Sequence, residues 1–488
     1  MVRGVLLTLL IAAAVAAVPE LAVRDHNKDK SASKRPTVRV PLNPAMQNSP
    51  MAMDQRHLRP PPPVVSADHD IFVGLSAFRD GARCGKTIFT GFSRAERPDR
   101  LFFGVVDQLL SGDEACVDAY CKLAAKAWPG HACKYRDQIT VDARDAATSR
   151  GPTYARHFQQ KLVGDQEFCL QLDAHSEFTT SWDSGLVHEW TRTGNEMAIL
   201  TTYLHDIYTH IHPNGTNLGA TTAPHICQTT RGGSGNVRNV AADLIYNSQQ
   251  PQMSALWGAG LSFSKCHAER RVPIDSHTKW MFDGEEFLRA AHLWTYGYDM
   301  YSPSVRGLVV YHNYTAVPAK FFELKVDRDM KALETKRANN RVKFLVGRPF
   351  VGEIDAEELD VYGWGNVRSF AAYLNFSGLS FVDGVPDRQS CEQLHWVPYA
   401  NAAPIEALVP GWKLAPATTA PPETEPVEVP TAAVRAPAAM RRGKGWLPAA
   451  TLVANAPPPS LPIAWIIFLV GGSVVLYFVP RSHAGKYN

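Results

Sequence analysis

The chain has 488 residues, of which 45% are hydrophobic and 10% aromatic, and its formal net charge at pH 7 is +3. This length and composition suit a globular protein of one large domain or two. The small net charge gives no reason to expect a nucleic-acid partner. Eight cysteines are too sparse for a disulfide-based scaffold. Three of them crowd one region and can bridge locally in an oxidising compartment: Cys116, Cys121 and Cys133.

Two segments precede the predicted domain. Residues 1–18 carry Arg3 and then an apolar run, a pattern typical of a secretory signal peptide or a short signal anchor. The run is too short to favour a membrane-spanning helix, so we expect it to be cleaved. Residues 19–68 are polar and end in the proline run 60–63, which predicts a disordered, proline-rich stem.

Strands alternate with helices in the first part of the predicted domain, which spans 69–400. Short apolar runs predict strands over residues 70–76, 101–108, 139–141 and 168–172. Helical segments are expected over 87–92 and 151–156. Because strands that alternate with helices usually pair in parallel, this order predicts an α/β domain with a right-handed, doubly wound sheet.

The second part of the domain has a different pattern. Residues 182–206 show helical spacing of their apolar side chains. Residues 211–251 are rich in Asn, Gly and Thr, which predicts a loop with an edge strand. An amphipathic helix is expected from Glu285 onward, and a strand over 309–311 directly precedes His312.

The C-terminal segments predict a membrane anchor. Residues 401–460 are rich in proline and alanine, as in a juxtamembrane linker. Residues 461–479 carry no charge and are long enough to cross a bilayer as a transmembrane helix. Positive charges in the tail, 480–488, favour a cytosolic tail, although Arg441, Arg442 and Lys444 on the other side of the span oppose this orientation. We therefore expect the domain to be lumenal, in the endoplasmic reticulum or Golgi. Three Asn-x-Ser/Thr sequons agree with that location: Asn214, Asn313 and Asn375.

An Asp-x-His motif ends the strand predicted over 168–172. Because side chains alternate faces in extended backbone, Asp173 and His175 point to the same side. A carboxylate and an imidazole at the carboxyl end of a strand form half of a divalent-metal site. A rival Asp-x-His occurs at 275–277, but Pro273 argues against a central strand there. Asp173 and His175 are therefore the preferred metal ligands.

Six segments together resemble one known family. They read FVGLSAFRD (72–80), GPTYARH (151–157), LQLDAHSEF (170–178), WGAGLSFS (257–264), FDGEEFLRAAHLWTYGYDMYSP (282–303) and VVYHNY (309–314). Over 70–400 the chain is similar to the polypeptide α-N-acetylglucosaminyltransferases of glycosyltransferase family 60, and more distantly to the mucin-type polypeptide GalNAc transferases. The resemblance implies a single GT-A-type, Rossmann-like catalytic domain. It also implies retaining transfer of GlcNAc from UDP-GlcNAc to a Ser, Thr or hydroxyproline hydroxyl of a polypeptide.

The resemblance further implies a Mn2+ site with three ligands: Asp173, His175 and His312. A divalent cation stabilises the charge that develops on a diphosphate leaving group, so Asp173 would also help to bind the donor. Mn2+ accepts mixed carboxylate and imidazole ligation. Asn313 belongs to a sequon and directly follows His312. A glycan on Asn313 would crowd the metal, so glycosylation of Asn313 and metal binding by His312 conflict.

Other roles implied by the resemblance concern the donor and the acceptor. Arg79 and Asp80 lie where the family's first strand meets the nucleotide, and a carboxylate there can accept a hydrogen bond from uracil. Arg156 matches an arginine near the diphosphate, where a guanidinium can pair two oxygens at once. Glu285 and Glu286 match catalytic-site acids that face the acceptor and the hydroxyls of the donor sugar.

Several alternatives stay open at this point. No short motif fixes the donor sugar, so UDP-GalNAc and UDP-Gal are alternatives to UDP-GlcNAc. No nucleophile is evident, so retention by front-face displacement and by a covalent intermediate are both open. From another class, the chain can be an inactive, membrane-anchored glycan-binding protein, although its intact ligand set argues against this. A metal-dependent hydrolase ranks third, because the chain has no His-Glu-x-x-His motif.

Overall fold

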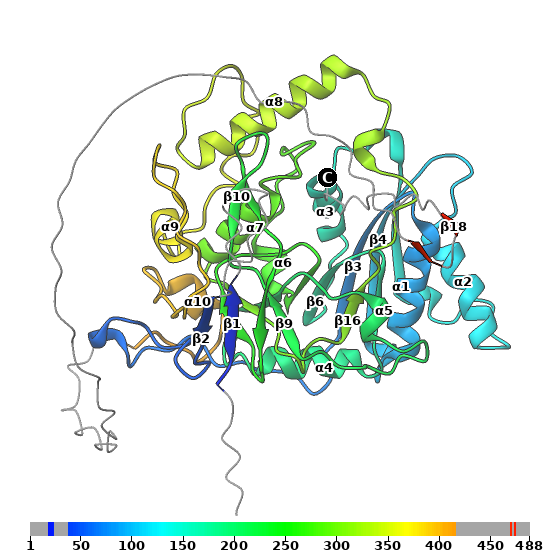
Figure 1. Cartoon of the computed structure of the whole chain (residues 1–488), viewed down its shortest axis with the longest axis horizontal. Helices are drawn as coiled ribbons and strands as arrows, with labels where there is room; N and C mark the ends of the chain where they lie inside the picture. The colour runs from blue at the N-terminus through cyan, green and yellow to red at the C-terminus, as the bar shows by residue number, and fades with distance from the viewer. Residues whose placement is uncertain (1–17, 24–37, 416–468, 471–472, 475–488) are drawn as a thin grey trace, which may run out of the picture. The chain divides into compact units, whose positions relative to one another are not determined.

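The computed structural model describes four parts of the chain: residues 18–23, 38–415, 469–470 and 473–474. The chain divides into two compact units, Met1–Pro421 and Pro422–Asn488. The first unit contains the folded domain (Figure 1). In the second unit, only two short strands are described, β17 (Leu469–Val470) and β18 (Ser473–Val474), and they pair antiparallel.

The centre of the first unit is an eight-stranded mixed sheet. Its strand order is β13-β15-β8-β14-β6-β3-β4-β5. Four neighbouring strands are parallel, β3 (Ile71–Phe78), β4 (Leu101–Leu109), β5 (Ile139–Asp145) and β6 (Phe168–Asp173). These confirm the four strands predicted from apolar runs. The predicted parallel sheet is thus present in one half of the molecule.

The other half of the sheet is mixed. β14 (Leu261–Lys265) lies antiparallel between β6 and β8 (Ala198–Thr201). β15 (Asp299–Ser302) runs parallel to β8, and β13 (Gln252–Ser254) closes the edge antiparallel to β15. The α/β fold class is confirmed, whereas a wholly parallel sheet is not.

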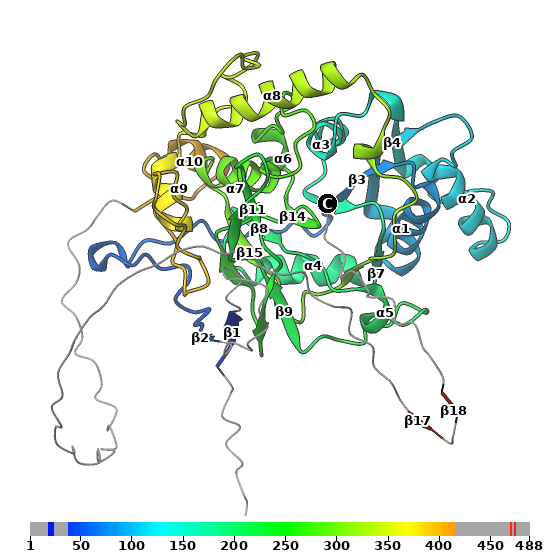
Figure 2. The same ribbon diagram turned by 45° about the horizontal axis from the view of Figure 1, so that its top comes forward.

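Helices cover both faces of the parallel half. On one face, Val73 and Leu75 of β3 belong to the main hydrophobic core with Ile88 of α1 (Gly81–Arg94). On the other face lies α3 (Pro152–Gln160), which starts with the predicted proline. Gly74 makes this second contact possible, because a Cβ there would lie 2.4 Å from the Gln159 side chain. Figure 2 shows α1 and α3 on either side of the sheet.

The prediction of a continuous helical segment over 182–206 is wrong in its second half. Helix α4 (Trp182–Thr191) is present, but Ala198–Thr201 form β8 in the middle of the sheet. All four residues of β8 are buried. A short strand that is buried on both faces has no alternation of polar and apolar residues, so periodicity does not separate it from a buried helix.

Residues 211–251 contain more strands than the single edge strand predicted. The four strands are β9 (Thr222–His225), β10 (Thr229–Arg231), β11 (Val237–Asn239) and β12 (Asp243–Tyr246). β10 and β11 form a hairpin, while β9 and β12 belong to a second, four-stranded sheet with the order β2-β1-β12-β9. These strands are three or four residues long, which is too short for a clear alternating pattern.

The segment predicted to be a disordered stem is folded over its described residues. β1 (Glu20–Val23) pairs with both β12 and β2 (Val38–Pro41). Leu21 and Leu42 are almost fully buried in a small core under the second sheet. A few apolar side chains thus fix a polar segment to the domain, and composition alone does not reveal such sparse contacts. The predicted linker likewise begins too early, because 401–415 are described and include α10 (Ala403–Leu408).

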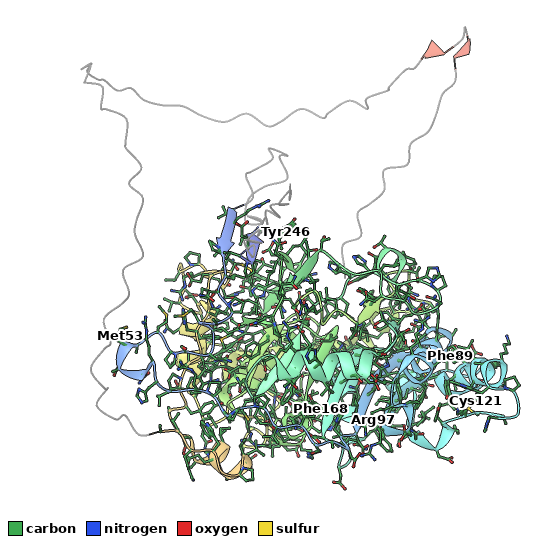
Figure 3. The ribbon with its side chains drawn as sticks, turned by 90° about the horizontal axis from the view of Figure 1, so that it is seen from below. Met53, Phe89, Arg97, Cys121, Phe168 and Tyr246 are labelled. Carbon is green, nitrogen blue, oxygen red and sulfur yellow. A yellow bond between two sulfur atoms is a disulfide. The ribbon has the colours of Figure 1, made fainter. Side chains whose placement is uncertain are left out.

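The remaining elements complete the domain. The helices are α2 (Cys116–Ala127), α5 (Ile207–His210), α6 (His267–Arg271), α7 (Glu285–Thr295), α8 (Arg328–Leu345) and α9 (Phe370–Ser377). The short strands are β7 (Ser176–Phe178) and β16 (Val310–His312). The 3-10 helices are Met53–Gln55, Pro98–Arg100, Arg136–Gln138, Ala146–Thr148 and Phe321–Glu323. The helix predicted from Glu285 and the strand preceding His312 are confirmed. Figure 3 shows Phe168 within the domain and Met53, Cys121 and Tyr246 towards its periphery.

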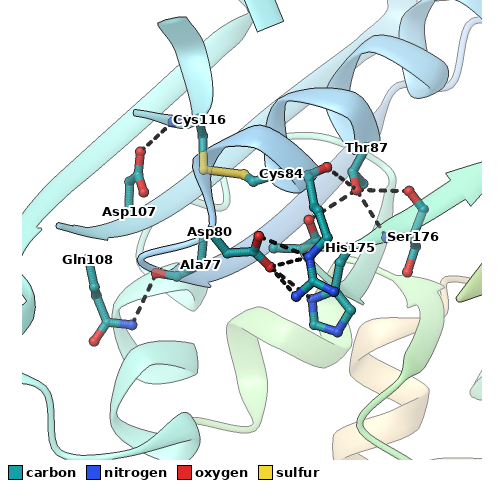
Figure 4. The surroundings of a disulfide bond; sticks show 11 residues. Ala77, Asp80, Cys84, Thr87, Asp107, Gln108, Cys116, His175 and Ser176 are labelled. Carbon is teal, nitrogen blue, oxygen red and sulfur yellow. Dashed lines mark hydrogen bonds and ion pairs between the residues drawn. A yellow bond between two sulfur atoms is a disulfide. The ribbon is translucent and has the colours of Figure 1, made fainter. Parts of the chain in front are cut away.

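All eight cysteines form disulfide bonds. The pairs are Cys84–Cys116, Cys121–Cys133, Cys169–Cys266 and Cys227–Cys391. The local pairing expected in the region of three cysteines is confirmed for Cys121 and Cys133. Cys116 instead bonds to Cys84 and joins the first turns of α1 and α2 (Figure 4).

The predicted targeting segments are largely outside the described residues. This holds for the signal segment 1–18 except Val18, and for most of the predicted transmembrane helix 461–479. The residues described within 461–479 are the paired strands β17 and β18, so they do not show the predicted helix. Among the helices within the described ranges, none combines the length and the hydropathy that crossing a membrane requires.

Candidate functional site

The predicted metal ligands converge through the pairing of two short strands. Asp173 is the last residue of β6, and His175 directly precedes β7. β7 pairs antiparallel with β16, and this register sets Ser176 opposite His312. The strand pair therefore carries His312 from a distant part of the chain to the end of β6.

The distances within this trio suit joint binding of a cation. His312 Nε2 lies 3.3 Å from Asp173 Oδ2, and the ring centroids of His175 and His312 are 4.6 Å apart. One potential ligand atom from each of the three residues lies within 4.8 Å of the others. In addition, Nδ1 of His312 is buried without a hydrogen-bond partner. The structure thus brings together the three residues predicted as metal ligands.

The electrostatics of Asp173 and His175 favour metal-binding protonation states. Burial raises the pKa of Asp173, but the hydrogen bond from His312 and the charges of His175 and Arg156 outweigh it and hold this pKa below its usual range. Burial lowers the pKa of His175 to about 4 against the opposing effect of Asp173. At neutral pH Asp173 is an anion and His175 a neutral imidazole, as metal ligands must be. One carboxylate and two imidazoles fit a divalent transition metal.

Arg156 joins the trio to helix α7. Its guanidinium lies 3.3 Å from Asp173 Oδ1 and forms an ion pair with Glu285, the first residue of α7. The Arg156 side chain is 11% exposed, so two carboxylates hold a nearly buried cation at the edge of the metal cluster. The structure therefore unites Arg156, Asp173 and Glu285, which the sequence analysis placed in one site.

Glu286 is held by three hydrogen bonds. Its carboxylate accepts from the Tyr203 hydroxyl at 2.5 Å, from Asn239 Nδ2 at 3.0 Å and from the Ala259 backbone N–H at 2.9 Å. Burial raises the pKa of Glu286 to about 7, although the bonds from Tyr203 and Ala259 act in the opposite direction. The side chain is thus fixed in orientation and changes its protonation near physiological pH.

Tyr203 and Asn239 were not predicted as site residues. Tyr203 lies just beyond the carboxyl end of β8, and Asn239 ends β11. A polar residue just past a sheet strand is a weak signal of a ligand site in α/β proteins. That signal was hidden for Tyr203, because β8 was predicted to be helical.

Arg79 and Asp80 differ in their relation to the metal cluster. Asp80 Oδ2 lies 3.7 Å from His175 Nδ1, and Arg83 donates to both carboxylate oxygens of Asp80 at 2.9 and 2.8 Å (Figure 4). Arg79 instead forms a two-point ion pair with Asp113, at 2.6 and 2.9 Å. Asp80 therefore borders the predicted ligands, whereas the Arg79 guanidinium is engaged in the loop after β4.

A further buried acid, Asp107, was missed by the sequence analysis. It lies near the carboxyl end of β4, opposite Ala77 of β3. Asp107 is 1% exposed and accepts the Cys116 N–H at 2.7 Å, while its Oδ1 atom has no partner. Burial raises the pKa of this carboxyl to about 6. The only sequence signal was its place at the end of a predicted strand.

The rival Asp-x-His lies elsewhere and has its own partners. Asp275 accepts from the buried Arg341 at 2.7 Å. His277 lies between Asp355 and Glu358, with 3.0 Å to each carboxylate. Asp275 and His277 lie in the loop between α6 and α7, and ligand atoms of His277, Asp355 and Glu357 also gather within 4.8 Å of one another. The preference for Asp173 and His175 therefore stays a prediction.

A comparison with protein-family models decides the family. The model described as "Glycosyltransferase (GlcNAc)" matches residues 70–132 and 120–383, more than half of the chain. The chain belongs to this family of GlcNAc glycosyltransferases. No curated protein matched this glycosyltransferase in sequence.

The solved structures that match this chain include three glycosyltransferases. GalNAc-T7 with UDP, GalNAc and Mn2+ is 14% identical with a TM-score of 0.41, and 63% of this chain and 56% of that chain are covered. The mannosyltransferase PcManGT from Pyrobaculum calidifontis, with GDP-Man and Mn2+, is 11% identical with a TM-score of 0.33 and coverages of 60% and 69%. TarS 1-349 from S. aureus, with UDP-GlcNAc, is 12% identical with the same TM-score and coverages. The glycosyltransferase thus spans little more than half of the GalNAc-T7 chain.

Proposed function

We propose that this glycosyltransferase transfers GlcNAc from UDP-GlcNAc to a hydroxyl group of a polypeptide, on Ser, Thr or hydroxyproline, with a GT-A-type, metal-dependent site. The observation that carries the proposal is the convergence of Asp173, His175 and His312 within 4.8 Å, beside Arg156 and Glu285. A binding module has no need of a metal-ligand set joined to a buried arginine and two oriented acids.

The ligand set gives the site its expected cofactor. Asp173, His175 and His312 would hold Mn2+, which would neutralise charge on the diphosphate of the donor. Asp80, 3.7 Å from His175, borders this set and keeps its own charge balanced by Arg83.

The other residues bind and orient. Arg156 can pair with diphosphate oxygens, and its ion pairs with Asp173 and Glu285 keep its guanidinium at the cluster. Glu286 is immobilised by Tyr203, Asn239 and Ala259, so that it can orient a hydroxyl of the donor sugar or of the acceptor. Fixing a reacting hydroxyl supplies a large part of the barrier reduction in group transfer.

The proposal also includes the location. A lumenal domain in the endoplasmic reticulum or Golgi, tethered through 461–479, agrees with the four disulfides, because such bonds persist in oxidising compartments.

A donor screen tests the function. The purified chain is incubated with UDP-GlcNAc, UDP-GalNAc or UDP-Gal, Mn2+ and hydroxyl-bearing peptides, and UDP release and peptide mass are measured. We expect UDP-GlcNAc to give the fastest transfer and Asp173→Asn to remove most of that activity. Nucleotide binding without any UDP release would instead indicate a glycan-binding protein, and UDP release with transfer of another sugar would correct the donor.

A further inference from the structure

A groove runs along one face of α8, outside the metal cluster. It has a volume of about 720 Å³ and lies between this helix, the segment 349–351 and the tip of the β10–β11 hairpin at Ser234. The helix contributes the lining residues Ala332, Thr335, Lys336, Asn339, Asn340 and Lys343. With a rise of about 1.5 Å per residue, the stretch from 332 to 343 is roughly 16 Å long. This length fits about five residues of extended polypeptide.

The charge of the groove is one-sided. Lys336 and Lys343 line it, and no lining residue is an acid. Neither lysine forms an ion pair with any residue that the structure describes. The nearby acid Glu353 forms its ion pair with Arg337, and the charge of Lys336 also lowers the pKa of the Glu353 carboxyl. Glu353 thus offsets part of the positive charge beside the groove, but Lys336, Lys343 and Arg337 together outnumber it, which favours an occupant with carboxylates.

The opposite wall of the groove is apolar. Pro349, Phe350 and Val351 line it, and Val351 is 84% exposed. An exposed apolar strip beside two lysines suits a polypeptide with both acidic and apolar side chains, because its apolar groups can cover this strip.

One end of the groove is connected to the catalytic region. Asn339 accepts a hydrogen bond from Asn236 Nδ2 at 2.7 Å, and the same amide donates to the carbonyl oxygen of Asp283 at 3.2 Å. Asp283 precedes Gly284 and the start of α7 at Glu285. The hairpin of Asn236 also supplies Asn239, which holds Glu286. Figures 1 and 2 both show α8 crossing above α7 and this hairpin.

We propose that this groove binds an acidic segment of the acceptor polypeptide, a few residues away from the hydroxyl that receives the sugar. The proposal rests on the proposed polypeptide transfer and adds the substrate class that the site selects. Carboxylates of the acceptor would pair with Lys336 and Lys343, and the chain would continue past Asn339 towards Glu285 and Glu286.

The test uses two matched peptide pools and the complete chain. Each peptide has a central Thr, Ser or hydroxyproline. In the acidic pool the three to five residues on each side of it are Asp and Glu, and in the neutral pool they are Asn and Gln. Binding of fluorescent peptides is measured by anisotropy, with UDP and Mn2+ present, and transfer from UDP-GlcNAc is measured in parallel. We expect the acidic pool to bind about tenfold more tightly, and 0.5 M NaCl to reduce this preference, since salt screens exposed charges.

Charge-reversal variants locate the effect. Lys336→Glu and Lys343→Glu should each weaken binding of the acidic pool several-fold and raise its KM, while donor hydrolysis stays unchanged. Lys126→Glu, on the exposed face of α2, makes the same charge change far from the groove and should have no effect. Equal affinity for the two pools, or equal losses in the Lys126 and groove variants, would overturn the inference. Selective binding without transfer to either pool would support the groove and contradict the proposed polypeptide transfer.

Discussion

His312 Nε2 lies 3.3 Å from Asp173 Oδ2, although the two residues come from strands far apart in the sequence. The contact depends on the antiparallel pair β7–β16, which is only three residues long on each side. Binding of a cation by both residues would therefore also stabilise this small pair, since a ligand that binds only the folded state adds to its stability.

The first prediction concerns the metal cluster. Asp173→Asn should lower the transfer rate by about 100-fold or more, because the variant loses the only carboxylate of the ligand trio. Isothermal titration of UDP in Mn2+ should show weaker binding, and Mn2+ should no longer raise the melting temperature. Asp118→Asn, on the exposed side of α2, is the matched control and should behave like the wild type. Full activity of Asp173→Asn, or of the wild type in excess chelator, would contradict the metal site.

The second prediction concerns Glu286 and Tyr203. The hydrogen bond from Tyr203 lowers the pKa of Glu286, which burial has raised to about 7. Tyr203→Phe should therefore raise this pKa further, and the acid limb of the kcat profile should move to higher pH if the Glu286 carboxylate is needed. Glu286→Gln should remove that limb and lower kcat about 100-fold, with UDP binding retained.

The control for the Tyr203 and Glu286 variants is Tyr246→Phe, because Tyr246 is a partly exposed residue of the second sheet. Rates are measured between pH 5.5 and 9, together with melting temperatures to confirm folding. An acid limb that stays in place in Tyr203→Phe, or a wild-type rate in Glu286→Gln, would exclude Glu286 from catalysis.

The third prediction concerns the stability contributed by Asp107. Because burial raises its pKa from 3.8 to about 6, the folded state favours the protonated carboxyl. This stabilisation is complete below about pH 4 and is lost as the pH rises through 6. Asp107→Asn does not titrate, so it should gain on the order of 2 kcal/mol relative to the wild type between pH 4 and 8. Urea unfolding at several pH values measures this, and parallel curves for the two proteins would show that Asp107 is an ordinary carboxylate.

The fourth prediction concerns topology. If 461–479 span the membrane and the domain is lumenal, protease added to sealed microsomes should leave 69–400 intact. Enzymatic removal of N-glycans should reduce the apparent mass, and Asn214→Gln should remove part of that change, because Asn214 is exposed in a turn. Digestion of the domain in intact vesicles would place it in the cytosol and direct the search for acceptors to hydroxyproline.

The sequence predicted the parts of the fold with long, regular signals. β3, β4 and β6 are apolar runs that end at polar residues, and α7 begins with the acids expected at Glu285 and Glu286. These signals are local, so a single stretch of chain contains all the information needed to predict the strand or helix that it forms. The metal trio was also found, because Asp173 and His175 share a strand end and the resemblance supplied His312.

What the sequence did not predict depends on contacts between distant segments. Tyr203 and Asn239 became site residues only because β8 and the β10–β11 hairpin both reach Glu286. The ion pair of Arg79 with Asp113 has no local signature either, since it depends on the path of the loop after β4. Segment 38–68 looked disordered because only a few of its residues, such as Leu42 and Leu58, are buried.

The disulfides have a practical consequence for producing this glycosyltransferase. Cys169 lies on the same strand as Asp173, and Cys84 directly follows Arg83 in the first turn of α1, which Asp80 precedes. In a host cytoplasm that keeps thiols reduced, these two disulfides would not form. The strand β6 and the helix α1 would then each lose a covalent link beside the predicted metal ligands. Recombinant protein made there should show weak Mn2+ affinity even when it is soluble. Secretion into an oxidising compartment is therefore the sensible route to material for kinetic and crystallographic work.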